Sequence, residues 1–192
     1  MRPSSLLSIF LIAAPSLAIP TFLSPRKCVS DPSTYQGSIS KLEPNSPSTN
    51  GQRFLVWKDT NGTVLESLIQ FTNIPTGAWG CQLELIFSKG YPYLTGMYNG
   101  NHQLYVYRVT ETIQSGASWD SAPKPTYLFG NTPGELLVNQ PIQNDMKIII
   151  NSATCAPTMG FRVALPPEAA KGGVYFQTDD TWKNVGFRMT YC

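Results

Sequence analysis

The chain has 192 residues, with 14 lysines and arginines against 12 aspartates and glutamates. Charged residues make up only 14% of the sequence, well below the usual share of about 25%. No basic run stands out, so we expect no nucleic-acid partner. The length suits a single domain that buries a hydrophobic core of its own.

Residues 1–18 have the features of a secretory signal peptide. Arg2 precedes a short apolar stretch, and Ser16 and Ala18 place small residues at the two positions that a signal peptidase reads. The apolar stretch is short for a bilayer-spanning helix; an uncleaved anchor or a buried N-terminal helix is the alternative. We therefore expect export, cleavage after Ala18 and no membrane association of the mature chain.

Residues 19–52 are predicted to form an arm or linker. Serine, threonine, proline and asparagine dominate from residue 29 onward, and few large apolar side chains are available to order the segment. This composition is typical of a loosely attached arm that offers sites for O-glycosylation. An ordinary long surface loop is the alternative.

Residues 53–192 show the pattern of an all-β domain. Short apolar and β-branched runs alternate with turn residues, and Asn61-Gly62 between two such runs is a strong signal for a hairpin. The pattern predicts an antiparallel β-sandwich of about nine or ten strands with minimal helix, at most one turn at 166–172. The expected strands are 53–58, 64–71, 82–87, 104–109, 127–130, 135–138, 147–151, 161–165, 174–178 and 185–191.

Four cysteines follow the predicted leader, and an even number in an exported chain favours two disulfides. Three pairings are possible, and we favour Cys28–Cys192 and Cys81–Cys155, which join the two ends and the two internal positions. No CxxC pair is present and His102 is the only histidine, so we expect no metal site and no cofactor.

Several segments, read in order, carry a family resemblance. They are FLVWKDTNGT (54–63), FTNIPTGA (71–78) with Cys81, GYP (90–92), LYVY (104–107), IINS (149–152) with Cys155, and TYC (190–192). Together they resemble the But-two C-terminal domain family of secreted ascomycete proteins. The resemblance implies a secreted fungal β domain with no established catalytic residues. The family is named for a cytosolic partner, Uba-three, which an exported chain would not meet.

Loop aromatics are the candidate ligand-binding residues. Tyr91, Tyr93 and Tyr98 crowd one Gly/Pro-rich loop, and Trp119 lies in another. Exposed aromatic faces on a β scaffold can stack on sugar rings, although packing at the ends of the sandwich is the alternative for each of them. Asn61 begins the sequon Asn-Gly-Thr on the predicted hairpin tip and is the candidate glycosylation site.

No set of catalytic residues emerges from the sequence. His102 would be needed for a Ser–His–Asp triad but is more simply a loop histidine, and no nucleophile-elbow motif is present. Glu66 and Glu84 fall on predicted strands and leave a two-carboxylate glycosidase open. Asp179 and Asp180 suit either a calcium site or a turn.

The sequence therefore favours a secreted, non-enzymatic domain associated with a cell wall or another extracellular surface. Its partner would be a wall polysaccharide or an extracellular protein. A carbohydrate-active enzyme with paired carboxylates is the alternative, and a host-directed effector is a third possibility.

Overall fold

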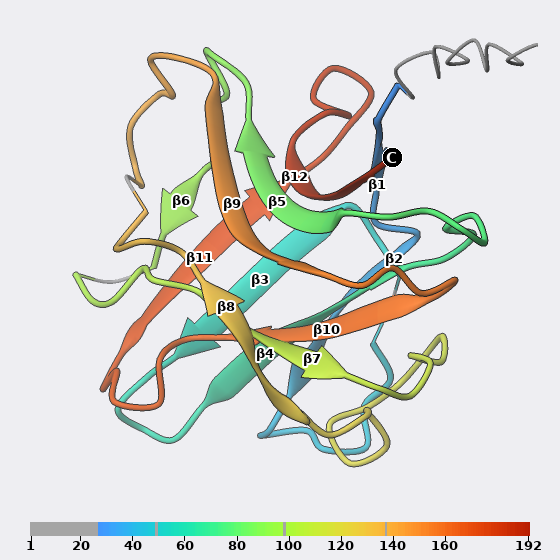
Figure 1. Ribbon diagram of the computed structural model, residues 1–192. Helices are drawn as coiled ribbons and strands as arrows, with labels where there is room; N and C mark the ends of the chain where they lie inside the picture. Colours follow the sequence, from blue (N-terminus) through green and yellow to red (C-terminus); the bar gives the residue numbers. More distant parts are fainter. Residues whose placement is uncertain (1–26, 49, 98, 137) are drawn as a thin grey trace, which may run out of the picture.

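A computed structural model describes residues 27–48, 50–97, 99–136 and 138–192. Within these ranges twelve strands form two antiparallel sheets, and no helix is present (Figure 1). The strands are β1 (Val29–Pro32), β2 (Tyr35–Ser40), β3 (Arg53–Lys58), β4 (Val64–Phe71), β5 (Cys81–Phe87), β6 (Thr95–Gly96), β7 (Tyr105–Val109), β8 (Tyr127–Asn131), β9 (Met146–Ala153), β10 (Met159–Ala164), β11 (Gly172–Gln177) and β12 (Gly186–Tyr191). The all-β sandwich is confirmed, with slightly more strands than predicted.

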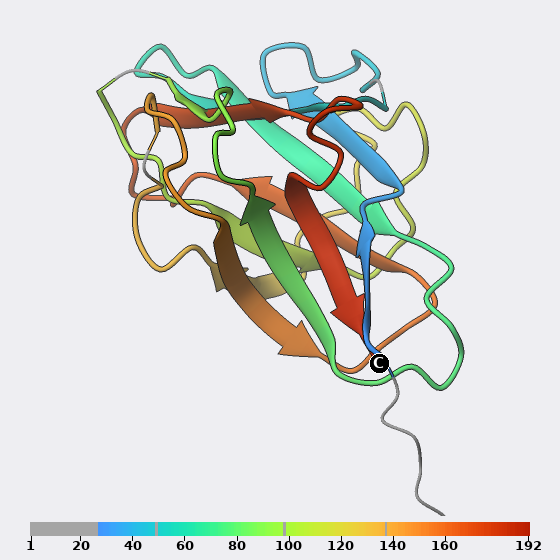
Figure 2. The ribbon, with the colours of Figure 1, turned by 90° about the horizontal axis from the view of Figure 1, so that it is seen from above.

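The smaller sheet has the strand order β1-β12-β5-β9. The larger sheet has the order β6-β11-β3-β4-β10-β7-β8. The remaining strand, β2, pairs with the edge of β4 that lies opposite β10. Figure 2 shows the molecule from above, with β9, β5, β12 and β1 lying side by side. The strands β5, β4 and β10 are buried along most of their length, as their central places in the two packed layers require.

The main core fills the space between the two sheets. Alternate residues of β4 and β10, such as Ile69 and Phe161, point inward to meet Leu83 and Leu85 of β5. Phe54 stacks on Phe176 with ring centroids 4.4 Å apart. The two-residue period of the strands explains this division, because every second side chain must face the opposite layer.

A second, smaller apolar cluster lies on the outer face of the large sheet. Leu68 and Val109 point outward there, and segment 110–126 covers them with Ile113 and Ala117. Ile39 of β2, which lies beside β4 in the same sheet, completes the cluster. Trp119 packs at the margin of this cluster. The large sheet is therefore buried on both faces at one end, and the uncovered remainder of its outer face borders a pocket.

The segment predicted to be an arm or linker contains two strands instead. β1 pairs with β12 in the small sheet, and β2 pairs with β4 in the large sheet. Tyr35 and Ile39 are buried, with Gly37 between them on the same face. The alternation of Tyr35, Gly37 and Ile39 on one face was not recognised within a segment rich in serine and proline. Residues 29–40 are therefore part of the β-sandwich and not of a linker.

Other expected boundaries differ in smaller ways. Residues 135–138 were predicted to be a strand, but Glu135 and Leu136 lie in irregular structure, although Leu136 is buried. The short strand β6 was not predicted. The proposed helical turn after Pro166 is a turn closed by the Ala169 N–H, which donates to the Pro166 carbonyl.

Both favoured disulfides are confirmed. Cys28–Cys192 joins the start of β1 to the end of β12, and Figure 2 shows these two segments together at one end of the molecule. Cys81–Cys155 joins the start of β5 to the residues after β9. Cys28–Cys192 therefore links the two ends of the described chain, while Cys81–Cys155 links neighbouring strands of the small sheet. The predicted leader lies outside the described residues.

Candidate functional site

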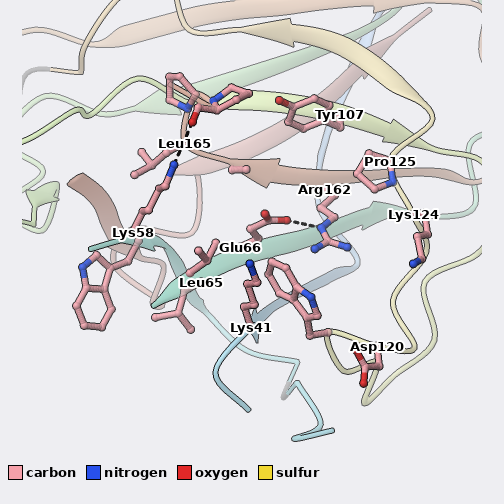
Figure 3. A pocket seen from close by; sticks show the side chains of 16 residues that line it. Lys41, Lys58, Leu65, Glu66, Tyr107, Asp120, Lys124, Pro125, Arg162 and Leu165 are labelled. Atoms are coloured by element: carbon pink, nitrogen blue, oxygen red, sulfur yellow. Dashed lines mark hydrogen bonds and ion pairs between the residues drawn. The ribbon is translucent and has the colours of Figure 1, made fainter. Parts of the chain in front are cut away.

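A pocket of about 570 Å³ lies on the outer face of the large sheet (Figure 3). Its volume falls within the range usual for ligand sites, about 300–1,000 Å³. Strands β3, β4, β7 and β10 form its floor, and segments 119–125 and 165–167 form its walls. The pocket thus draws on parts of the chain far apart in sequence.

An ion pair lies at the centre of the pocket. Arg162 of β10 and Glu66 of β4 point outward from their strands, and Arg162 Nε donates to Glu66 Oε2. The side chains are only 8% and 16% exposed. A charge with so little water around it needs its partner, so each side chain fixes the position of the other.

Trp119 forms one wall of the pocket through its contact with Arg162. The Arg162 guanidinium carbon lies 4.5 Å from the centroid of the Trp119 ring, a cation–π contact. Trp119 is half-buried, so the ring combines a fixed position with exposed area. A wall of this kind needs little reorganisation when a ligand packs against it.

Three lysines surround this centre. Lys58 lies at one end of the pocket and Lys124 at the other, with Lys41 between them (Figure 3). Lys58 Nζ donates to the Pro167 carbonyl at 3.0 Å. Asp120 is the one other carboxylate in the lining, and four cationic side chains therefore face two anionic ones.

Tyr107 of β7 supplies a hydroxyl in the pocket lining. Burial raises the pKa of Tyr107, and the negative charge of Glu66 raises it further. The phenol therefore keeps its proton at neutral pH and is able to donate a hydrogen bond. Leu65, Leu165 and Pro166 add apolar surface to the pocket.

A second pocket of about 640 Å³ is larger but chemically plainer. Ser38, Ser48, Gln52 and Thr178 are typical of its lining, and Arg53 is its one cation. The pocket around Arg162, by contrast, combines three aromatic side chains with six charged ones. We therefore take it as the candidate site.

The structure places Tyr91 in the core between the sheets, with its side chain fully buried. Its hydroxyl donates to the Gln177 carbonyl at 2.5 Å and accepts from the Gln177 N–H at 2.9 Å. Burial raises the pKa of Tyr91 to about 12, partly offset by the hydrogen bond to Gln177. Tyr91 is thus a packing residue in this conformation.

The other predicted aromatics are in different places. Tyr93 is 40% exposed and lies 5.7 Å from the Tyr91 ring, while Trp119 belongs to the outer face of the large sheet. Tyr98 lies outside the described residues. The structure therefore brings Trp119 into the candidate site and leaves Tyr91 and Tyr93 apart from it.

The two strand carboxylates weighed for a glycosidase are separated. Glu66 lies on the large sheet and Glu84 on the small one, and both point away from the core. Glu84 is buried under Lys147, whose Nζ lies 2.7 Å from Glu84 Oε1, and Thr190 donates to its other oxygen at 3.0 Å. These two residues cannot act together on one substrate.

The remaining polar candidates have local roles. Asp179 accepts from the backbone N–H groups of Thr181 and Trp182 at 2.9 and 2.8 Å, as in a turn. His102 Nδ1 lies 3.8 Å from Glu135 Oε2. Among the residues that the structure describes, no three His, Cys, Asp or Glu side chains gather as metal ligands.

Asn61 is exposed at the tip of the β3–β4 hairpin, where its sequon is accessible. In the described part of the chain, no helix is long and apolar enough to cross a bilayer.

The chain matches no protein-family model and no curated protein.

Sequence reasoning missed most of the site. Arg162 and Tyr107 were read only as strand residues, and Lys41 fell in the presumed linker. A signal was present, since an arginine inside the apolar run from Phe161 to Leu165 needs a partner. Its partner, 96 positions away, depends on which strands pair.

Proposed function

We propose that this chain is a secreted, non-enzymatic domain that binds polysaccharide of a cell wall or another extracellular surface. Glycosylation at Asn61, a fungal origin and membership of the But-two C-terminal domain family are parts of this proposal. The last two rest on the sequence resemblance alone.

The observation that carries the proposal is the fixed aromatic wall of the pocket. Trp119 is held by Arg162 in a pocket whose lining also contains the Tyr107 hydroxyl and the Glu66 carboxylate. Sugar rings offer apolar C–H faces rimmed by hydroxyls, so an aromatic face next to polar groups suits them. The two disulfides and the predicted leader support an extracellular location.

Binding of the secreted protein to insoluble wall polysaccharides, measured by pull-down and by affinity electrophoresis, tests the proposal. Trp119→Ala should weaken binding at least about tenfold, as expected for loss of a central aromatic contact. Trp79→Ala is the matched control, because Trp79 is 58% exposed and lies beside the C-terminus, away from the pocket.

A second variant protects the test against misfolding. Tyr107→Phe removes one hydroxyl from the pocket and should lower affinity severalfold without disturbing the packing of the ring. The proposal fails if no polysaccharide is retained. It also fails if Trp79→Ala weakens binding while Trp119→Ala and Tyr107→Phe do not.

A carbohydrate-active enzyme remains the second candidate, since Glu66 and Asp120 line the same pocket. The Glu66 carboxylate is already engaged by Arg162, which suits a structural charge better than a proton donor. Release of reducing sugar from a bound polymer, abolished in Asp120→Asn, would favour the enzyme; binding without release favours the binding domain.

A further inference from the structure

The charges of the pocket are unbalanced, and this imbalance bears on the ligand. Arg162 and Glu66 neutralise each other, which leaves three lysines against Asp120. The whole chain carries a formal net charge of +2, and the lining of this one pocket carries the same surplus. Positive charge is therefore concentrated here.

The lysines are spread along the pocket rather than gathered at one point. Lys58 and Lys124 lie at opposite ends and Lys41 lies between them (Figure 3). They come from three separate segments: the residues after β2, the end of β3 and the loop before β8. Lysines spaced in this way are better placed to pair with charges repeated along a polymeric ligand than with one isolated phosphate.

The surface between the lysines is suited to sugar rings. Trp119 offers the exposed part of its ring, Pro166 and Leu165 offer apolar area, and the Tyr107 hydroxyl keeps its proton for donation. Arg162 already has a carboxylate partner, because its Nε donates to Glu66 and its guanidinium lies over the Trp119 ring. The three lysines therefore supply the positive charge that Glu66 does not neutralise.

We infer that the ligand of this pocket is an acidic polysaccharide, a polymer whose sugars carry carboxylate or sulfate groups. The inference rests on the proposed function and narrows it to one class of ligand. The rings pack on Trp119 and the apolar wall, and the anionic substituents pair with Lys41, Lys58 and Lys124.

The test compares four polymers on the secreted full-length chain: polygalacturonate, dextran sulfate, a neutral β-1,3-glucan and poly-glutamate. We expect polygalacturonate or dextran sulfate to bind at least about tenfold more tightly than the neutral glucan and poly-glutamate. Because exposed charges are screened over about 10 Å at 0.1 M salt, the preference should shrink as salt is raised.

Lys41→Gln combined with Lys124→Gln should lower affinity for the acidic polymer about tenfold, since each exposed ion pair contributes up to about fivefold. Lys89→Gln makes the same change of charge at an exposed residue of the β5–β6 loop and should have no effect. Both variants replace surface residues, so folding should be preserved.

The outcomes separate the inference from the proposed function. If the neutral glucan binds as tightly as the acidic polymers, the choice of an acidic ligand is wrong and the polysaccharide-binding proposal stands. Equal binding of poly-glutamate, or an equal loss in Lys89→Gln, shows general attraction of anions and overturns the inference. If no polymer binds, the proposed function fails as well.

Discussion

Arg162 is the residue on which the shape of the pocket most depends. It holds Glu66 through an ion pair and Trp119 through its guanidinium, although its own side chain is nearly buried. Arg162→Met should lower the free energy of unfolding by about 3 kcal/mol, because Glu66 is left as a poorly solvated charge. Urea unfolding followed by tryptophan fluorescence measures the loss.

The matched control removes both charges. Glu66→Met together with Arg162→Met replaces the pair by apolar side chains and should recover most of the lost stability, as other buried pairs do. Equal losses in the single and double variants would show that the ion pair has no energetic role, and that Arg162 contributes through its stem alone.

Tyr91 predicts a pH dependence at the alkaline end. Its pKa is raised to about 12 in the fold, against 10.0 ordinarily, so the folded state favours the protonated phenol. That contribution to stability is complete below pH 10 and is lost as the pH rises through 12, up to about 3 kcal/mol. Tyr91→Phe should flatten the fall between pH 10 and 12, as measured by urea midpoints; an unchanged slope would contradict this assignment.

At the scale of the strands, Ser67 explains how the backbone pairing between β3 and β4 can stop after two residue pairs. The two strands pair only at Trp57–Leu65 and Lys58–Val64. Beyond this point the buried Ser67 hydroxyl donates to the Leu55 carbonyl at 2.8 Å and accepts from the Leu55 N–H at 3.2 Å. A side chain thus satisfies the backbone groups that a regular ladder would have paired.

Ser67→Ala should therefore destabilise the fold by about 1–3 kcal/mol, because the Leu55 N–H loses its partner and the Leu55 carbonyl keeps only the longer bond from Ser38 Oγ at 3.4 Å. Thermal unfolding of this variant beside Ser46→Ala, an exposed serine, measures the difference. A Ser67→Ala midpoint equal to that of Ser46→Ala would mean that the strands close up or that water replaces the hydroxyl.

β1 is held by its pairing with β12 and by the Cys28–Cys192 bond. Replacing both of these cysteines by alanine opens a loop with a sequence separation of 164 residues and should lower the free energy of unfolding by about 5 kcal/mol on the chain-entropy model. Opening the Cys81–Cys155 loop in the same way should lower it by about 4 kcal/mol. Hydrogen exchange should then quicken first at residues 29–32. Uniform quickening across β4 and β10 would show that β1 is not a separable element.

The sequence predicts elements well where the local signal is complete. Asn61-Gly62 forms the turn that its composition predicts, with Gly62 at φ 89°, and the strands on either side have the expected bounds. β1 and β2 were missed because their order depends on strands far away in the sequence. Tyr35 and Ile39 of β2 are apolar, but Ser38 and Ser40 beside them are half-buried and pair with residues of β4.

At the scale of the whole molecule, the site depends on which sheet each strand joins. Glu66 and Glu84 are eighteen positions apart and face away from the core alike, yet they lie on opposite surfaces because β4 and β5 belong to different sheets. Arg162 and Trp119 meet only because segment 110–126 folds over the large sheet. Strand periodicity predicts which side chains point outward, but not which outward side chains meet.

The most direct test uses the four tryptophans as reporters of the bound surface. Trp57 and Trp119 line the pocket, whereas Trp79 is exposed elsewhere and Trp182 packs 5.5 Å from Tyr91. In a titration of the ¹⁵N-labelled protein with oligogalacturonate, the indole resonance of Trp119 should shift most, followed by Trp57, and those of Trp79 and Trp182 should stay in place. Shifts confined to Trp79 or Trp182 would place the ligand on another surface and contradict the account.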